Sequence, residues 1–244
     1  MPFETLHIPI PDGHADAFAV CPSGNERRPG VLMYPDGFGI RPVLRDLAGE
    51  LAGHGYYVLV PNVFYRHGPA PVGELPAHIG EDARPHVMAR IMPLIAAHSR
   101  ERAVRDAAAY LDFLTARPEV APGPVAVTGY CFGGLLAVRT AAAHAERVAA
   151  VAAFHAPVLA DGPELFAHLK ARAHFGHAEG DLTPEALAGL NHTLDAAGVE
   201  HTSEIYPGTV HGFTMSDTDA FDASGLRRHW ERLLPLLSRS FTEK

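Results

Sequence analysis

The sequence is poor in cysteine and contains no long apolar run. Its two cysteines, Cys21 and Cys131, lack the Cys-x-x-Cys spacing of zinc or dithiol sites, so we expect no structural zinc and no disulfide. No window approaches the roughly 18 consecutive apolar residues of a membrane span. The N-terminal residues lack the basic and apolar regions of a secretory signal. These absences predict a cytoplasmic protein that does not bind a membrane.

Positive charge is also scarce. The chain has 20 Lys and Arg residues against 28 Asp and Glu residues, which gives a formal net charge of −8 at pH 7. This balance opposes binding to a phosphate backbone, so nucleic acid is not expected as a partner. With 244 residues, of which 47% are apolar and 20% charged, the chain has the composition of a globular protein with a sizeable core.

Apolar, β-branched runs alternate with Ala/Leu/Arg-rich stretches of helical period along nearly the whole chain. This alternation predicts one α/β domain over residues 1–244, with a mostly parallel sheet of about seven to eight strands and helices on both faces. Residues 5–10 and 15–21 flank the turn Pro11-Asp12-Gly13, which predicts an antiparallel hairpin at the sheet edge. The remaining strands are expected at residues 30–34, 56–60, 125–128, 148–154, 171–175 and 202–206. Helices are expected at residues 43–54, 99–116, 164–169, 183–197 and 221–237, and directly after Cys131.

Residues 62–85 form a long segment with several prolines and glycines. Loops of this length inside a domain are commonly functional. We therefore expect this variable loop to line a pocket.

The most informative segment is a predicted strand that leads into Gly129-Tyr130-Cys131-Phe132-Gly133-Gly134 and then into a helical pattern. This is the form of a nucleophile elbow, with Cys in the place of the usual Ser. The nucleophile sits at a strained backbone corner, and side chains two residues before and after it would clash, so glycine is needed there. A cysteine at the N-terminus of the following helix is favoured as the thiolate. The alternative is a small buried cysteine in a tight turn.

A thiol nucleophile needs a base and an acid. In folds with a nucleophile elbow these follow along the chain in the order nucleophile, acid and histidine. Among 16 histidines, His211 follows a predicted strand and lies between Gly208 and Gly212, so it is the expected base. Asp181 is the expected acid and Glu179 the reserve candidate. Asp181 also lies just before a predicted helix, where a purely structural role is open.

An oxyanion hole requires two backbone N–H donors. Phe132 would supply one and Gly37, in the turn Pro35-Asp36-Gly37-Phe38-Gly39, the other. Asp36 could point toward Cys131, where a negative neighbour would disfavour the thiolate. Phe38 and Tyr130 are expected beside the pocket. His174 and His177 lack partners at a metal-ligand spacing, so no metal site is predicted.

The elbow, the turn at residues 35–39 and the segment His211-Gly212-Phe213 resemble the dienelactone hydrolase family of α/β-hydrolases over nearly the full length. The resemblance implies hydrolysis of a small ester or lactone through a thioester: Cys131 attacks, His211 moves the proton and Asp181 orients the imidazole. It implies a small-molecule substrate and no cofactor. We expect a monomer or a homodimer.

Two positions depart from the family pattern. Its best-known members carry Glu where Asp36 stands, and an arginine four residues after the histidine, where this sequence has Met215. Arg66, Arg84 and Arg90 are the candidates for holding a substrate carboxylate. The particular substrate stays open.

Two other functions also stay open. A non-catalytic binding protein on the same fold would keep the pocket without the chemistry, although all three residue types of the triad are present. A thiol redox protein would use Cys131 on peroxide or a disulfide, although the second cysteine, Cys21, lies in the predicted edge strand.

Overall fold

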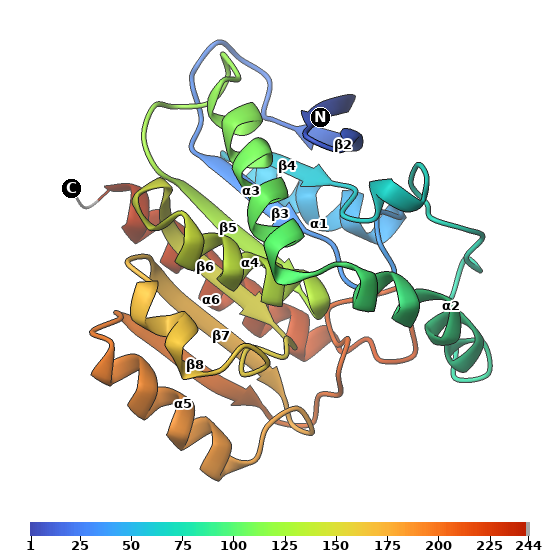
Figure 1. The fold of residues 1–244 in the computed structure, drawn as a ribbon, viewed down its shortest axis with the longest axis vertical. Helices are drawn as coiled ribbons and strands as arrows, with labels where there is room; N and C mark the ends of the chain where they lie inside the picture. The colour runs from blue at the N-terminus through green and yellow to red at the C-terminus, as the bar shows by residue number, and fades with distance from the viewer. Residues whose placement is uncertain (243–244) are drawn as a thin grey trace.

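Parallel strands form the centre of the structure. The computed structural model describes residues 1–242, and its eight-stranded sheet has the order β1-β2-β4-β3-β5-β6-β7-β8 (Figure 1). The β1–β2 and β2–β4 pairs are antiparallel and all other pairs are parallel. The strands are β1 (Phe3–Ile10), β2 (Gly13–Val20), β3 (Gly30–Tyr34), β4 (Tyr57–Pro61), β5 (Val125–Tyr130), β6 (Val148–Phe154), β7 (Arg172–Ala178) and β8 (His201–Tyr206). This confirms the predicted α/β-hydrolase architecture with its N-terminal antiparallel hairpin.

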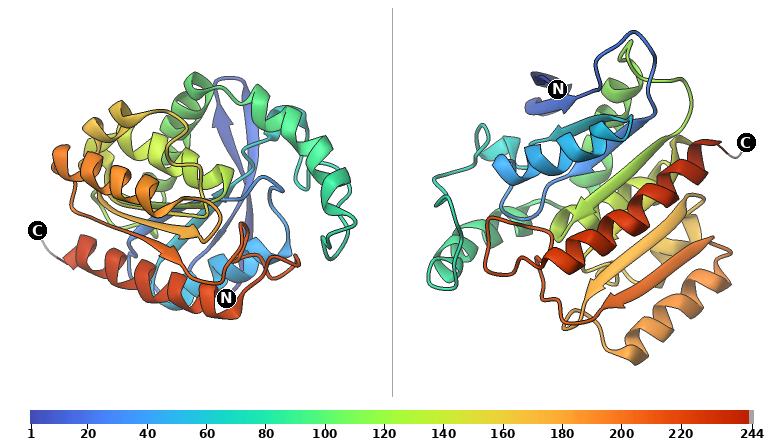
Figure 2. Two further views of the ribbon diagram at one scale, coloured as in Figure 1. Left: turned by 90° about the horizontal axis from the view of Figure 1, so that it is seen from below. Right: turned by 180° about the vertical axis from the view of Figure 1, so that it is seen from behind.

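Helices cover both faces of the sheet. The α-helices are α1 (Pro42–Gly53), α2 (Arg84–Ala97), α3 (Arg100–Thr115), α4 (Phe132–Ala143), α5 (Pro184–Ala196) and α6 (Ala223–Thr242). Short 3₁₀ helices are η1 (Tyr65–His67), η2 (Ala145–Arg147) and η3 (Pro163–His168). Helices α1 and α6 lie on one face, and α3, α4 and α5 lie on the other (Figure 2). None of the described helices is long and apolar enough to cross a membrane.

The continuous apolar runs of the central strands follow from this arrangement. Successive side chains of a strand point to opposite faces, so both faces of a covered sheet must be apolar. In β3, Val31 and Met33 pack in the layer with α1 and α6, whereas Leu32 and Tyr34 pack in the layer with α3 and α4. The core therefore consists of two layers separated by the sheet.

Local signals correctly predict where several helices begin. The Ser99 hydroxyl accepts a hydrogen bond from the Arg102 amide at the start of α3, and the Thr183 hydroxyl accepts one from the Ala186 amide at the start of α5. Pro184 occupies the first turn of α5, where no N–H is needed. The predicted helix at residues 164–169 is the 3₁₀ helix η3.

Helix α2 was not predicted. It has prolines at positions 85 and 93, and only Val87 and Ile91 are buried, so its sequence lacks the apolar stripe of a helix packed on a sheet. It packs instead against the segment around Ile79, in a small apolar cluster away from the main core. The predicted loop at residues 62–85 is therefore followed by a helix, α2, that the sequence analysis did not include.

The turn between β5 and α4 is strained in the way that the glycine pattern predicts. Cys131 has φ 52° and ψ −121°, a backbone conformation that non-glycine residues rarely adopt. A Cβ atom on Gly129 would lie 2.2 Å from the Gly133 carbonyl oxygen, and one on Gly133 would lie 2.1 Å from the Pro35 carbonyl oxygen. A Cβ on Gly134 would lie 2.5 Å from that of Ala156. Glycine at these positions lets three backbone segments meet around Cys131.

We predict that Gly133→Ala destabilises the protein by about 3 kcal/mol or more, because the added methyl group would overlap two backbone carbonyls that cannot rotate away. Gly189→Ala in α5 is the matched control, since no atom lies within 4 Å of its Cβ position. The control should keep or slightly raise stability. Chemical denaturation of both variants measures the difference, and equal midpoints would contradict the prediction.

Candidate active site

The loops that follow the parallel strands meet at one edge of the sheet. Residues 35–39 follow β3, Cys131 follows β5, His155 follows β6, Asp181 comes after β7 and His211 comes after β8. The carboxyl ends of parallel strands are the usual place for a site in open α/β sheets. The candidate site is thus assembled from five segments far apart in the sequence.

The structure brings Cys131, His211 and Asp181 together at this edge. Nδ1 of His211 lies 2.8 Å from Oδ1 of Asp181, and His211 and Cys131 line the same cavity. Burial by itself would lower the pKa of His211, but the hydrogen bond to Asp181 and the neighbouring Cys131 thiol raise it to about 10. An imidazole with so high a pKa is a strong base toward the neighbouring thiol.

The reserve acid, Glu179, has a different place. Its Oε2 accepts a hydrogen bond from the Gly208 amide at 2.7 Å, and its own amide donates to the Thr209 carbonyl. Glu179 therefore holds the turn that precedes His211, whereas Asp181 contacts the imidazole itself.

The two residues predicted as oxyanion donors lie in segments next to Cys131. Phe132 is the first residue of α4, so its N–H has no partner within the helix, and the helix dipole places partial positive charge there. Gly37 lies in a turn closed by the Gly39 amide, which donates to the Asp36 carbonyl at 3.0 Å. Gly37 and Cys131 line the same cavity. The two amides predicted as oxyanion donors thus belong to segments that flank the thiol.

The Asp36 side chain is bound by a buried arginine. Nη1 and Nη2 of Arg41 donate to the two Asp36 oxygens at 2.6 and 2.9 Å, and Nε donates to Asp217 at 2.6 Å. Burial opposes the charge of Arg41, but Asp36 and Asp217 keep the pKa of Arg41 above its ordinary value. Between residues 1 and 242 no hydrogen bond joins Asp36 to Cys131. Arg41 balances the charge of Asp36 and ties the turn at residues 35–39 to the loop after His211.

A cavity of about 60 Å³ adjoins the thiol. Its lining residues are Asp36, Gly37, Phe38, Arg84, Met88, Ile95, Cys131, His155, His211, Gly212, Met215 and Thr218. The end of the predicted variable loop contributes Arg84, and α2 continues this wall with Met88 and Ile95. Apart from the cysteine and histidine pair, the wall is largely apolar.

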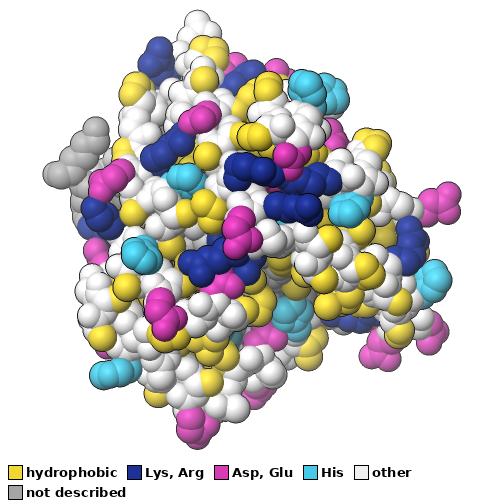
Figure 3. Space-filling view, viewed as in Figure 1, with side chains coloured by type: hydrophobic (Ala, Val, Ile, Leu, Met, Phe, Trp, Pro, Cys, Tyr) yellow, Lys and Arg dark blue, Asp and Glu magenta, His cyan; other side chains and the backbone are white. Residues whose placement is uncertain are grey.

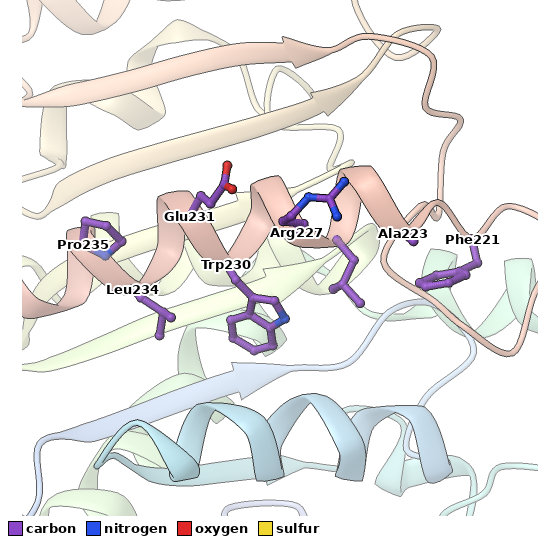
Figure 4. Close-up of a pocket in the computed structure, with 8 residues that line it drawn as sticks. Phe221, Ala223, Arg227, Trp230, Glu231, Leu234 and Pro235 are labelled. Carbon is purple, nitrogen blue, oxygen red and sulfur yellow. The ribbon is translucent and has the colours of Figure 1, made fainter.

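A larger hollow of about 530 Å³ lies along α6, away from this site (Figure 4). Trp230 and Leu234 line it together with Phe221, and its charged residues are Arg227 and Glu231. It contains no nucleophile, so the smaller cavity is the candidate active site.

The expectation that Tyr130 lines the pocket is wrong. Its side chain is fully buried in the layer with α6, and its hydroxyl lies 3.2 Å from Nε2 of His229. Strand alternation turns the last side chain of β5 into the core just before the chain bends at Cys131. Phe38, by contrast, lines the cavity.

The three candidate arginines differ in what they contact. Arg66 forms ion pairs with Asp12 and Asp106, both at 2.6 Å. Figure 3 shows Lys and Arg side chains gathered near α3 and interleaved with acidic ones. Arg90 donates to the Glu74 carbonyl and lines a separate hollow. Arg84 lines the cavity, stands 5.9 Å from the Phe38 ring centre and has no acidic partner within the described part of the chain.

Sequence reasoning missed His155, Arg41 and the wall provided by α2. His155 directly follows β6, as Cys131 follows β5, so its place after a buried strand was an available signal. Arg41 gave no such signal, because its partner Asp217 is 176 residues away.

The other strand-end histidines have structural contacts. His174 lies 2.7 Å from the Thr202 hydroxyl and 3.0 Å from that of Tyr206, and His177 lies 3.2 Å from that of Ser203. Burial lowers the pKa values of His174 and His177 to about 3 and about 4. In residues 1–242 no group of three or more His, Cys, Asp or Glu side chains is arranged to hold a metal ion.

The sheet topology, the nucleophile turn after β5 and the histidine after the last strand define an α/β-hydrolase. The model of the dienelactone hydrolase family matches residues 15–241, and the chain belongs to this family. It is a hydrolase of a family that acts on small molecules.

Sequence relatives and solved structures agree with this assignment. The chain is 32% identical over 117 residues to the carboxymethylenebutenolidase of Pseudomonas sp. strain P51, covering 48% of this chain and 45% of that protein. A provisionally named carboxymethylenebutenolidase of Methylorubrum extorquens is 22% identical over 238 residues, covering 93% of this chain and 78% of that protein. A dienelactone hydrolase-like promiscuous phosphotriesterase from metagenomic libraries has the same fold, with a TM-score of 0.82, 22% identity and 98% coverage of each chain.

We predict that Asp181→Asn lowers the pKa of His211 from its value of about 10, because it removes the carboxylate whose hydrogen bond raises it. Glu179→Gln is the control, since Glu179 contacts only backbone amides and carbonyls. NMR titration of the histidines measures the pKa of His211 in both variants. A larger shift in the Glu179 variant would reverse the assignment of the acid.

Proposed function

We propose that the protein hydrolyses a small carboxylic ester or lactone through a thioester on Cys131. The observation that carries this proposal is the placement of His211, which is hydrogen-bonded to Asp181 through Nδ1 and lines the same cavity as Cys131, whose thiol raises the pKa of its imidazole. This is the arrangement of an activated nucleophile, in which the base is itself oriented by a third group.

In the first half-reaction the sulfur forms a bond to the carbonyl carbon, and the π electrons move to the oxygen. The amides of Phe132 and Gly37 are suited to stabilise this oxyanion. When the intermediate collapses, the bond to the alcohol oxygen breaks and His211 donates a proton to that oxygen. The products are the alcohol and the acylated Cys131.

In the second half-reaction water attacks the thioester carbon while His211 removes a proton from the water. The carbon–sulfur bond then breaks and the thiolate–imidazolium pair is restored, while the product leaves as the carboxylic acid and releases its remaining proton to solvent. Asp181 keeps the imidazole in position through both steps.

The cavity supports a small acyl group. About 60 Å³ holds only a few heavy atoms, and Phe38, Met88, Ile95 and Met215 make its wall apolar. Arg84 provides the positive charge at this wall. We infer that the preferred substrates carry a carboxylate near the scissile bond, because Arg84 has no acidic partner in the described residues while Arg66 is already paired with two carboxylates.

The two alternative functions, a non-catalytic binding protein and a thiol redox protein, gain no support from any particular contact. Both cysteines are free. Cys21 directly follows β2, which lies between β1 and β4 and not at the predicted edge of the sheet, and burial together with Glu119 raises the pKa of its thiol. The hydrogen bond between His211 and Asp181, beside the Cys131 thiol, favours acyl transfer over simple binding.

We expect Cys131→Ala to lower ester hydrolysis at least about a thousandfold while the protein remains folded, because the nucleophile is lost and no other group can form the acyl-enzyme. Release of nitrophenol from nitrophenyl acetate measures this. Cys21→Ala is the matched thiol control and should retain wild-type activity. Hydrolysis at the wild-type rate by the Cys131 variant would rule out the thioester route.

Arg84→Gln should raise KM for an ester that carries a free carboxylate by about tenfold or more, since a hydrogen bond to a charged group contributes about 1.5–3 kcal/mol. KM for the neutral ester of the same acyl length should change little. Arg90→Gln, on the same helix but outside the cavity, is the control. Equal effects of Arg84→Gln on both esters would contradict a carboxylate-binding role.

A further inference from the structure

His155 has an unusual backbone conformation. Its φ is 38°, and among the described residues only Cys131 and His155 are non-glycine residues with positive φ. Such strain costs about 1–3 kcal/mol and persists only where surrounding contacts determine the conformation. Here the His155 amide donates to the Gly176 carbonyl at 2.7 Å, one residue beyond the end of β6. The strained residue is therefore held at the end of the sheet, next to the candidate site.

The side chain of His155 joins β6 to the loop that carries His211. Its Nε2 lies 2.8 Å from the Thr214 hydroxyl, and both side chains are fully buried. The His155 ring packs edge-on against the His211 ring, with 5.2 Å between centres and 71° between planes. The Phe213 ring also packs against the His155 ring, with 5.1 Å between their centres. His211 is thus contacted by Asp181 through Nδ1 and by His155 through its ring.

His155 remains neutral while His211 carries a proton. Burial, together with the positive charges of His211 and Arg84, lowers the pKa of His155 well below its ordinary value. The ring can therefore pack beside an imidazolium without repelling it.

The polar character of His155 is not required for packing. Its Nδ1 is buried without a hydrogen-bond partner in residues 1–242, which costs about 1–3 kcal/mol. A phenylalanine would fill the same space without an unpaired atom. The hydrogen bond that histidine adds in the structure is the one between Nε2 and Thr214.

We propose that His155 is a positioning residue: through its ring and its hydrogen bond to Thr214, it holds His211 in the orientation that serves both Cys131 and Asp181. This inference rests on the proposed function. A misplacement of about 1 Å in a catalytic group can lower the rate about a hundredfold, so a group that fixes one ring can control kcat without touching the substrate.

The test compares His155→Phe, which keeps a ring, with Thr214→Val, which keeps the shape of the partner but removes its hydroxyl. Thr214→Ser retains the hydroxyl and is the conservative control. With nitrophenyl acetate, we expect the first two variants to lower kcat about tenfold to a hundredfold and change KM less than about twofold. The control should stay within about twofold of wild type.

The pH profile separates positioning from general stability. This profile is measured with an alkyl acetate, because nitrophenolate leaves without a proton. His211 must be protonated to donate to the leaving alkoxide, so kcat/KM for the alkyl ester falls as pH rises through the pKa of His211. If His211 loses its orientation toward Asp181, that pKa decreases and the alkaline limb moves to lower pH in His155→Phe and Thr214→Val. Wild-type kcat in both, or an unchanged limb with only a lower melting temperature, would overturn the proposal. If the His155→Phe variant does not fold, the Thr214→Val variant alone tests the proposal.

Failure of the proposed function would give a different result. NMR titration of His211 needs no substrate, so a lowered pKa of His211 in Thr214→Val but not in Thr214→Ser supports the positioning role even if Cys131→Ala retains ester hydrolysis. An unchanged pKa of His211 in both variants counts against the positioning role, whatever the substrate.

Discussion

The close approach of three backbone segments around Cys131 is the constraint on which the rest of the site depends. Gly133 lies so near the Pro35 carbonyl that no Cβ fits between them, and a Cβ on Gly134 would likewise overlap that of Ala156. Because of these two approaches, the turn after β3 and the residues after β6 both come close to Cys131. A strained conformation at Cys131 is maintained because the packed sheet on both sides leaves no alternative path for the chain.

A second constraint is the placement of one histidine between an acid and a thiol. Glu179 and Asp181 divide this work: one holds the turn before His211 and the other contacts its ring. The buried neighbours of His211 stay neutral. Burial lowers the pKa of His155, as it does for the more distant His174 and His229, whereas Asp181 and Cys131 raise that of His211. One histidine in this region is therefore suited to carry a proton near neutral pH.

Charge pairing also determines which groups remain for a substrate. Arg41 binds Asp36 and Asp217, so the Asp36 carboxylate, which lines the same cavity as the thiol, is balanced within the protein. Arg66 is engaged by Asp12 and Asp106. Arg84 lines the cavity, where Met215 stands in the place of the arginine that well-known family members carry four residues after the histidine. One arginine without an acidic partner among the described residues thus lies beside largely apolar walls, and this pattern supports the proposed substrate with a carboxylate.

The sequence by itself determined the elements whose signals are local. Apolar runs gave the strands, Ser99 and Thr183 marked the helix starts, and the glycines around Cys131 indicated the elbow, because these features depend on neighbours along the chain. Chain order also led to His211 and to the segment that holds Glu179 and Asp181, with Asp181 as the expected acid. The tertiary structure alone decided what touches what across long separations: Arg41 with Asp217, His155 with Thr214, and the burial of Tyr130 against His229. Helix α2 belongs to this second group, since its few buried residues gain their partners only when the chain folds back over the site. Such contacts depend on packing in three dimensions, which leaves no periodic pattern in one sequence.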